Sequence, residues 1–204
     1  MNYQNVSFSD FNVSNDPLKD VKCQCNPCQC KKHKYAKCKY NAIDDRFKYL
    51  QPYLISLLEN LAYVQQSAKY HPEGGALFHS LQVFECALQC SDKPILWAAA
   101  LLHNVGKTID YPNHAHVGAE ELEGLVDPYI CWLIRHHLDL LTSSKKTRSR
   151  LKGSAKLQDL ESLRKWDLQG RRAGVEVMDV QQAIEILNPH FPQIAVSAVY
   201  INCS

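Results

Sequence analysis

Histidine is the residue type in this chain best suited to chemistry. Seven of the nine histidines among the 204 residues lie between His71 and His137, and most of them stand where an apolar helix is expected to begin or end. Asp167 follows on a further expected helix. Imidazole and carboxylate are ligands that transition and borderline metal ions accept, and facing helices can bring such ligands to one point. The pattern predicts a metal centre assembled from several helices.

Four common catalytic signatures are missing from the sequence. It contains no GxxxxGK[ST] phosphate loop, no GxGxxG dinucleotide turn, no GxSxG nucleophile elbow and no HExxH zinc motif. Each of these motifs carries a mechanism of its own. The sequence therefore offers no support for the enzyme classes that depend on them.

A cluster of cysteines near the N-terminus is the second candidate site. Residues 21–41 read VKCQCNPCQCKKHKYAKCKYN, and thiolates two to four residues apart suit tetrahedral zinc. Two other interpretations stay open, a loose metallothionein-like or disordered tract and a redox segment. Cys86 and Cys90, four residues apart on one expected helix, are interpreted as core thiols. The predicted ligands of a structural zinc are Cys23, Cys25, Cys28, Cys30, His33 and Cys38.

Composition and charge indicate an ordinary globular protein. Hydrophobic residues make up 46% and charged residues 22% of the chain, which excludes wholesale disorder. Lysine and arginine number 23 against 21 acids, so the overall charge predicts no nucleic-acid partner. Two stretches, 21–43 and 140–158, each hold six basic residues and no acid. Such a stretch is either a solvated surface or a surface that meets phosphate.

The chain is expected to be a soluble, cytoplasmic protein. Its longest unbroken apolar run, 95–102, is far shorter than the roughly 20 residues that span a bilayer. Its N-terminus shows no basic stretch leading into an apolar core, as a secretory signal would. In a reducing compartment, clustered thiols bind metal or stay free more often than they form disulfides.

The apolar pattern predicts an all-α body, residues 45–204, after a polar and Cys/Lys-rich N-terminal segment, 1–44. Apolar residues recur at spacings of three and four. Asp44 or Asp45 is the expected first cap, and Pro52 is tolerated only within the first turns of its helix. The stretch 95–103 is apolar nearly all round and should be the buried central helix. Further helices are expected near 47–61, 77–88, 117–124, 128–141, 155–169 and 178–187, with one lone strand at 195–201.

Five blocks of the sequence resemble the successive motifs of HD-domain metal-dependent phosphohydrolases. They are YHPEGGALFHSLQV (70–83), WAAALLHNVGK (97–107), HAHVGAE (114–120), LIRHH (133–137) and LRKWDLQGR (163–171). The blocks fall in the family's order and cover roughly residues 45–187, and they are most similar to the HD domain attached to CCA-adding tRNA nucleotidyltransferases. The resemblance implies an HD-domain helical bundle, and it does not extend to residues 1–44.

The resemblance also implies site residues. His116 and His136 are alternatives to His114 and His137 as metal ligands. Lys107 resembles the lysine beside bound phosphate, Arg171 and the basic run 145–156 are expected to line the mouth of the site, and His137, if it is not a ligand, would move protons. The implied metal ligands are His79, His103, Asn104 and Asp167, with His114 and His137 added in members that hold two metals.

Position 104 departs from the family, because Asn104 stands where the His-Asp pair requires aspartate. An amide can offer its carbonyl oxygen to a metal, but it cannot bridge two metals and it removes one negative charge. Metal affinity and the activation of water should both suffer. The substitution is either natural, in a degenerate member kept for binding or structure, or engineered to trap an inactive enzyme.

The resemblance implies a phosphohydrolase that uses a divalent metal such as iron, manganese, cobalt, nickel or zinc. The expected partner is a phosphorylated small molecule or nucleotide, and RNA is a further candidate. The alternative is a catalytically degenerate HD-domain protein with a metal-, nucleotide- or RNA-binding or regulatory role.

Overall fold

The computed structural model describes residues 39–196, with side chains from residue 49 onward. By its contacts the chain divides into two units, Met1–Ala42 and Ile43–Ser204. The six candidate zinc ligands, most of the first basic stretch and most of the expected strand at 195–201 lie outside the described residues. The domain boundary after residue 44 stays a prediction.

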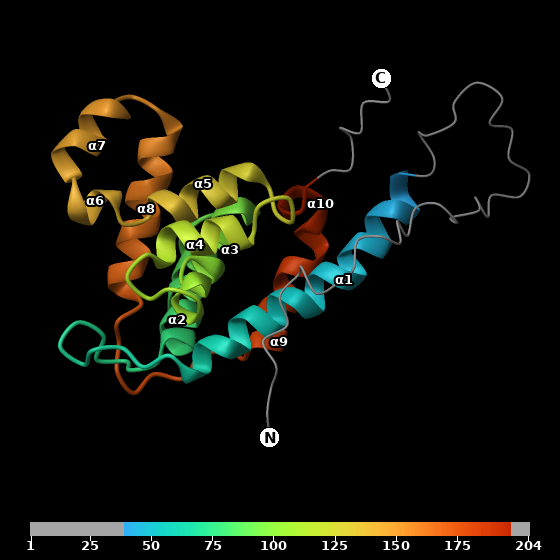
Figure 1. Ribbon diagram of the computed structural model, residues 1–204, viewed down its shortest axis with the longest axis horizontal. Coiled ribbons are helices and arrows are strands. Elements are labelled where there is room, and N and C mark those ends of the chain that lie inside the picture. Colours follow the sequence, from blue (N-terminus) through green and yellow to red (C-terminus); the bar gives the residue numbers. More distant parts are fainter. Residues whose placement is uncertain (1–38, 197–204) are drawn as a thin grey trace, which may run out of the picture. The chain divides into compact units, whose positions relative to one another are not determined.

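The described chain is helical, which confirms the all-α prediction (Figure 1). Over residues 39–196 there is no strand, only two isolated bridges that pair Gln65 with Gly75 and Val126 with Ala195. The α-helices and 3-10 helices (η) are α1 (Lys39–Asn60), η2 (Leu61–Tyr63), α2 (Ala76–Cys90), α3 (Pro94–Leu102), η3 (Val105–Thr108), α4 (His114–Glu121), α5 (Pro128–His136), α6 (Asp139–Thr142), α7 (Ser144–Arg150), α8 (Ala155–Gln169), α9 (Val180–Leu187), η4 (Asn188–His190) and α10 (Phe191–Ile194).

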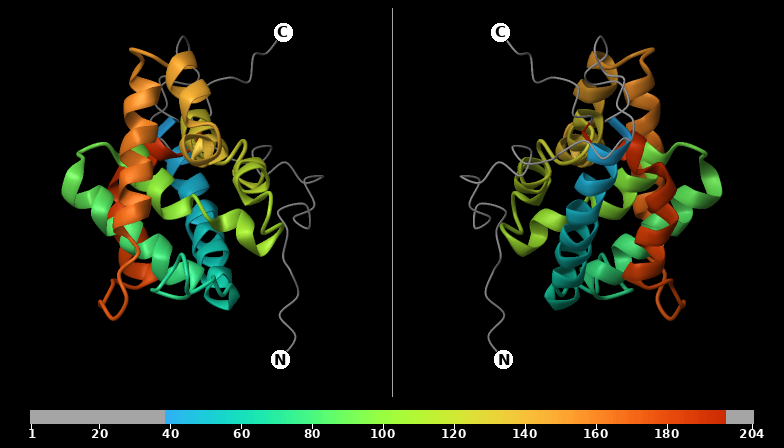
Figure 2. Two further views of the ribbon diagram at one scale, coloured as in Figure 1. Left: turned by 90° about the vertical axis from the view of Figure 1, so that its left-hand side faces the viewer. Right: turned by 90° about the vertical axis from the view of Figure 1, so that its right-hand side faces the viewer.

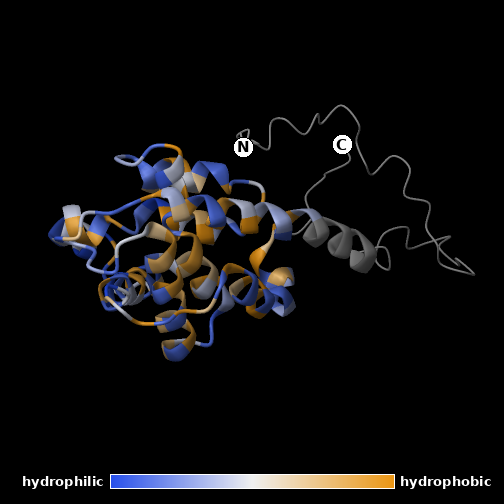
Figure 3. Ribbon diagram, turned by 90° about the horizontal axis from the view of Figure 1, so that it is seen from below, coloured by the Kyte–Doolittle hydropathy of each residue, from blue (hydrophilic) through white to orange (hydrophobic). Residues whose placement is uncertain are grey.

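Helix α3 forms the centre of the hydrophobic core, as its apolar composition predicts. Its residues 98–102 are fully buried, and it packs against α2, α5 and α8 (Figure 1, Figure 2). Figure 3 shows hydrophobic residues gathered where the helices of this unit meet. Buried apolar surface contributes roughly 25 cal/mol per Å² to stability. The core therefore holds α3, and the residues that follow its C-terminal end, in a fixed position.

Helix α1 begins earlier than the sequence predicts. It starts at Lys39, so Asp44 and Asp45 lie inside the helix and the predicted cap is wrong. Pro52 lies in the helix interior, where the loss of an N–H and the clash of its ring cost about 3 kcal/mol. Packing of the apolar face, which local propensity does not report, offsets this cost. The fully buried leucines that follow Pro52 are Leu54, Leu58 and Leu61.

Two helices end at a histidine of the predicted site. His103 is the C-cap of α3 and His137 is the C-cap of α5. In each, the ring Nδ1–H donates to the backbone carbonyl three residues earlier, Ala100 at 2.8 Å and Ile134 at 2.6 Å. The predicted continuous helix over 128–141 is wrong, because α5 ends at His136 and a separate helix, α6, begins at Asp139.

No described helix has the combination of length and apolar character needed to cross a membrane. This agrees with the short apolar runs of the sequence.

Gly106 is the point of closest approach between η3 and α4. A Cβ atom at Gly106 would lie 2.2 Å from the backbone oxygen of His114 and 2.6 Å from the backbone nitrogen of Gly118. Neither backbone atom can rotate away as a side chain would. The missing side chain thus allows the backbone that carries Lys107 to lie against the first turn of α4.

We expect Gly106→Ala to lower the free energy of unfolding by about 1–3 kcal/mol, the usual cost of overpacking. The measurement is urea denaturation at fixed pH. Gly75→Ala is the matched control, since a Cβ there meets no atom within 4 Å and only the N-cap preference for glycine is lost. Equal costs for the two variants would contradict the close packing at Gly106.

Candidate metal centre

Three of the predicted ligands converge from three different helical segments. One ligand atom from each of His79 on α2, His103 after α3 and Asp167 on α8 lies within 4.8 Å of the other two. His79 Nε2 lies 3.0 Å from Asp167 Oδ1, and the ring centroids of His79 and His103 are 5.5 Å apart. All three residues are buried. Their placement far apart in sequence and close in space is what a metal site shared between helices requires.

Three histidines of the centre carry the ring proton on the same nitrogen, Nδ1. The Nδ1–H groups of His103, His114 and His137 each donate to a backbone carbonyl three residues earlier, at 2.6–2.9 Å. The second nitrogen, Nε2, is thereby left as the unprotonated nitrogen of a neutral ring. This tautomer is the one that binds a metal through Nε2.

His114 and His137 form the second part of the centre. Their Nε2 atoms lie 3.3 Å apart, and the rings of His137 and His103 are 5.2 Å apart. Burial and the neighbouring His114 lower the pKa of His137 to about 3, and burial lowers the pKa of His114 as well. Two facing lone pairs attract a proton or a cation. The structure therefore brings these two histidines together with the first three ligands.

The two rival histidines point elsewhere. His116 is exposed on α4. His136 Nδ1 contacts Asp139 Oδ2 at 2.9 Å, and its ring packs on Trp132. Neither is placed to replace His114 or His137.

The carboxylate of Asp167 forms ion pairs with two arginines. Arg171 donates to both carboxylate oxygens at 3.0–3.2 Å, and Arg164 donates to Oδ2. Burial alone would raise the pKa of Asp167, but the hydrogen bond with His79 and the nearby positive charges hold it well below its usual range. Arg164 was not predicted as a site residue. Helical spacing could have identified it, because a residue three positions before Asp167 lies on the same face of the helix.

Arg171 lies against the ligand Asp167, whereas the described contacts of the basic stretch lie away from the histidines. Arg171 also donates to the backbone oxygen of Tyr70 at 3.3 Å, so its guanidinium is engaged in holding Asp167 and a loop. Part of the stretch 140–158 forms α7, which was not predicted as a helix. The described contacts of its side chains lie outside the histidine cluster: Arg148 with Glu161, Arg150 with Asp139 and Lys156 over the Trp132 ring.

Lys107 is a buried cation beside the centre. Burial lowers its pKa to about 8, against the attraction of Asp167. Its Nζ donates to Gln66 Oε1 and lies 5.5 Å from the Tyr111 ring centroid. The buried Nε2 of Gln66 has no hydrogen-bond partner among the described residues. Gln66 was not predicted as part of the site.

Asn104 contacts a ligand atom directly. Its side-chain Nδ2 lies 2.8 Å from His103 Nε2. Because His103 donates through Nδ1 to Ala100, its Nε2 is the acceptor and the amide of Asn104 is the donor. The amide thus occupies the lone pair that a metal would need, whereas an aspartate has no N–H to place there.

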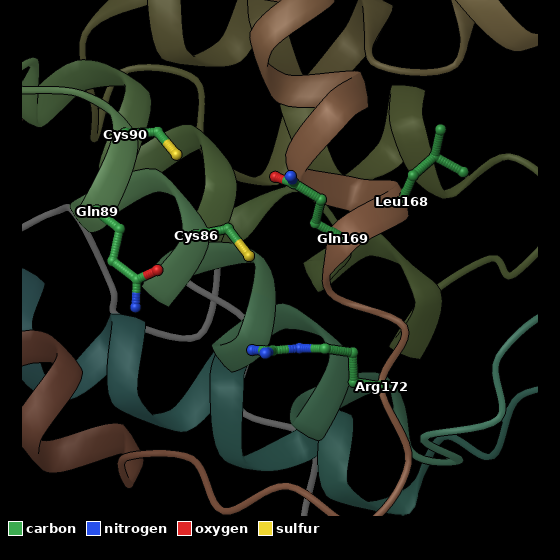
Figure 4. A pocket seen from close by; sticks show the side chains of 6 residues that line it. All are labelled: Cys86, Gln89, Cys90, Leu168, Gln169 and Arg172. Atoms are coloured by element: carbon green, nitrogen blue, oxygen red, sulfur yellow. The ribbon is translucent and has the colours of Figure 1, made fainter.

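A separate pocket of about 460 Å³ lies between the C-terminal parts of α2 and α8 (Figure 4). Cys86 and Cys90 point into it from α2, and Arg172 lies across from them. Cys86 is buried, as expected for a core thiol, whereas Cys90 is exposed. None of the site histidines lines this pocket.

The buried histidines predict acid sensitivity. Among the histidines of residues 49–196, burial lowers the pKa values of His71, His103, His114 and His137, whereas, against the effect of burial, Asp167 and Glu73 raise the pKa of His79. Below the unfolded pKa of about 6.5, the unfolded chain therefore binds more protons than the folded one. His79 opposes the trend, since its contribution is full below that pKa and is lost at higher pH. We expect the free energy of unfolding to fall as the pH is lowered from 7 to 5, with a slope that steepens below about pH 6.5 and amounts to about 1.4 kcal/mol per pH unit for each additional proton that the unfolded chain binds.

Urea denaturation in the presence of a chelator, repeated across this range, measures the slope. Replacing the exposed His116 by Ala is the control and should leave the slope unchanged. A free energy of unfolding that is level from pH 7 to 5 would show that the histidines are not buried in their neutral form.

Comparison with known families agrees with this geometry. The model of the HD domain matches residues 77–186, more than half of the chain. A comparison with curated proteins gives no match. The matched segment contains His79, His103, Asn104, His137 and Asp167. The chain belongs to the HD-domain family, in the superfamily of metal-dependent phosphohydrolases.

Proposed function

We propose that this protein is a metal-dependent phosphohydrolase that cleaves a phosphomonoester or phosphodiester of a nucleotide-like substrate. The observation that supports the proposal most directly is the convergence of His79, His103 and Asp167, whose ligand atoms lie within 4.8 Å of one another. A buried lysine beside them provides positive charge for a phosphoryl group. An RNA end carries the same phosphoester chemistry and belongs among the substrates to be tested.

The donor set fits a divalent first-row metal. Imidazole nitrogens and a carboxylate oxygen are ligands that iron, manganese, cobalt, nickel and zinc accept, and His79, His103 and Asp167 would hold the ion. When bound, such a metal supplies Lewis acidity that activates water and polarises a phosphoryl oxygen. The other steps belong to the chain's own side chains.

Lys107 and Gln66 would bind and orient the phosphoryl group. With its pKa lowered to about 8, Lys107 is still mostly protonated at neutral pH. The partnerless Nε2 of Gln66 is a second donor, on the side chain whose oxygen accepts from Lys107. Donors fixed in a buried site stabilise developing negative charge without having to reorganise.

His137 is the proposed proton carrier, with His114 as its partner. Both rings have lowered pKa values and a Nδ1–H committed to a carbonyl, so each presents a neutral Nε2. A neutral Nε2 accepts a proton, and the 3.3 Å separation of the pair allows the two rings to share it.

The contact between Asn104 and His103 favours a second candidate function. An amide that donates to His103 Nε2 must turn away before this nitrogen binds a metal. It also leaves Asp167 as the carboxylate of the ligand set. A member with this substitution would keep the scaffold for binding a nucleotide, RNA or metal without turnover.

We expect Asn104→Asp to raise metal affinity by ~10–100-fold, the scale seen when supporting interactions of a metal site change. The substitution removes the competing N–H and adds a negative charge. Mn²⁺ binding, measured by competition with a chelator, tests the affinity, and phosphomonoester and phosphodiester substrates test turnover. Asn188→Asp, on the exposed η4, adds the same charge away from the ligands and serves as the matched control.

The turnover of Asn104→Asp separates the two candidate functions. Turnover that rises together with Mn²⁺ affinity supports the phosphohydrolase. Tighter Mn²⁺ binding without hydrolysis of any phosphoester supports the binding role. Rapid hydrolysis by the unchanged chain would show that Asn104 does not impair the metal centre.

A further inference from the structure

A short hairpin, residues 64–75, contributes side chains to the centre from outside the matched HD segment. Its two arms are joined by backbone hydrogen bonds between Gln66 and Gly74 and between Ala76 and Val64, at 3.1 and 2.9 Å. The hairpin then leads directly into α2, and His79 lies on the first turn of that helix. Besides Gln66, it places His71 and Glu73 beside His79.

Glu73 is shared between two histidines. Its Oε1 lies 2.7 Å from His79 Nδ1 and 2.8 Å from His71 Nδ1. The Glu73 side chain is fully buried, and that of His71 is 15% exposed. The rings of His71 and His79 meet edge to face at 4.8 Å. His79 is therefore held on one side by Glu73 and on the other by Asp167.

The second oxygen of Glu73 is buried and has no hydrogen-bond partner among the described residues. An unsatisfied buried polar atom costs free energy, more so on a charged group. Burial raises the pKa of Glu73, but its hydrogen bonds, above all the one with His79, outweigh burial and lower the pKa. Glu73 is thus a buried anion with one oxygen shared by two histidines and the other without a partner among the described residues.

We propose that Glu73 is a positioning residue that fixes the ring of His79 for metal binding, with His71 supporting Glu73. A carboxylate on Nδ1 keeps the proton on that nitrogen, directs Nε2 toward the metal and makes Nε2 a stronger donor. The other three histidines of the centre use backbone carbonyls for this task. The inference rests on the metal centre of the proposed function and not on the reaction that it performs.

The backbone oxygen of Gly170, 3.1 Å from His79 Nδ1, is the alternative acceptor. It would retain some of the orientation if Glu73 were removed, but it carries no full charge. Glu73→Ala should therefore weaken metal binding without abolishing it. Glu73→Gln keeps an acceptor oxygen of the same size and should have the smaller effect.

The test measures Co²⁺ binding, by its visible absorption and by chelator competition, in the unchanged chain and in the Asn104→Asp background. We expect Glu73→Ala to lower Co²⁺ affinity by ~10–100-fold and Glu73→Gln by less. His71→Phe should lower it to a similar or smaller degree. Glu120→Gln, at an exposed glutamate of α4, is the matched control and should leave the affinity unchanged.

A second readout needs neither metal nor substrate. Nitrogen-15 NMR of the histidine side chains reports whether Nδ1 of His79 carries a proton and how strongly that proton is hydrogen-bonded. We expect a Nδ1–H directed at a carboxylate in the unchanged chain. In Glu73→Ala we expect altered signals of His79 and His71, the two rings that contact Glu73, with those of His103, His114 and His137 unchanged. A variant that merely loosened the hairpin would alter circular dichroism or urea denaturation instead.

Several results would overturn the inference. They are an unchanged Co²⁺ affinity in Glu73→Ala, an absence of Co²⁺ binding in both backgrounds, and a second Co²⁺ equivalent that disappears in His71→Phe. The last would mean that the hairpin binds an ion itself. A chain that hydrolyses no phosphoester but loses Co²⁺ affinity in Glu73→Ala would disprove the proposed reaction and leave this inference standing.

Discussion

The Nδ1 atoms of the site histidines are all committed to acceptors within the protein, and the rest of the centre depends on this constraint. Three donate to backbone carbonyls and His79 faces Glu73 and Gly170. Two of these hydrogen bonds lie at the C-terminal ends of α3 and α5, where His103 and His137 are the C-caps. The helix ends that the core holds in place therefore also fix the orientation of two of the rings. In His103, His114 and His137, the buried ring has its Nδ1–H hydrogen-bonded and presents an unprotonated Nε2.

The sequence predicted those site residues that lie within short, recognisable blocks. His79, His103 and Asp167 stand in blocks whose order identified them, and the structure brings their ligand atoms together. Glu73 was hidden because the HPEGG sequence indicates only a turn. Its contact with His79 depends on the hairpin folding back, which neither residue spacing nor burial pattern encodes. Arg164 was hidden for a different reason, since a charged residue on a helix is usually solvated.

The fold was predictable at the level of class and core, and less so at helix ends. The apolar run of α3 identified the central helix, because a helix that is hydrophobic on all sides must be buried. The position of Pro52 inside α1 is tolerated because buried leucines on the same helix pack in the core, which outweighs propensity. The break after α5 lies at His137, whose ring donates to the carbonyl of Ile134. Periodicity does not report such a side-chain contact.

The charges around the centre link metal binding to anion binding. Asp167 and Glu73 are the carboxylates that face His79, whereas Arg164, Arg171 and Lys107 are the cations nearest to them. These groups carry a net positive charge at neutral pH, and a divalent ion would add two more charges in a medium of low dielectric constant. A phosphoryl group would offset that charge, so each ligand should strengthen the binding of the other, and by the same factor. An aspartate at position 104 would add a negative charge to the centre in the absence of any bound anion. With an amide there, a bound phosphoryl group would be the source of that charge in the proposed function.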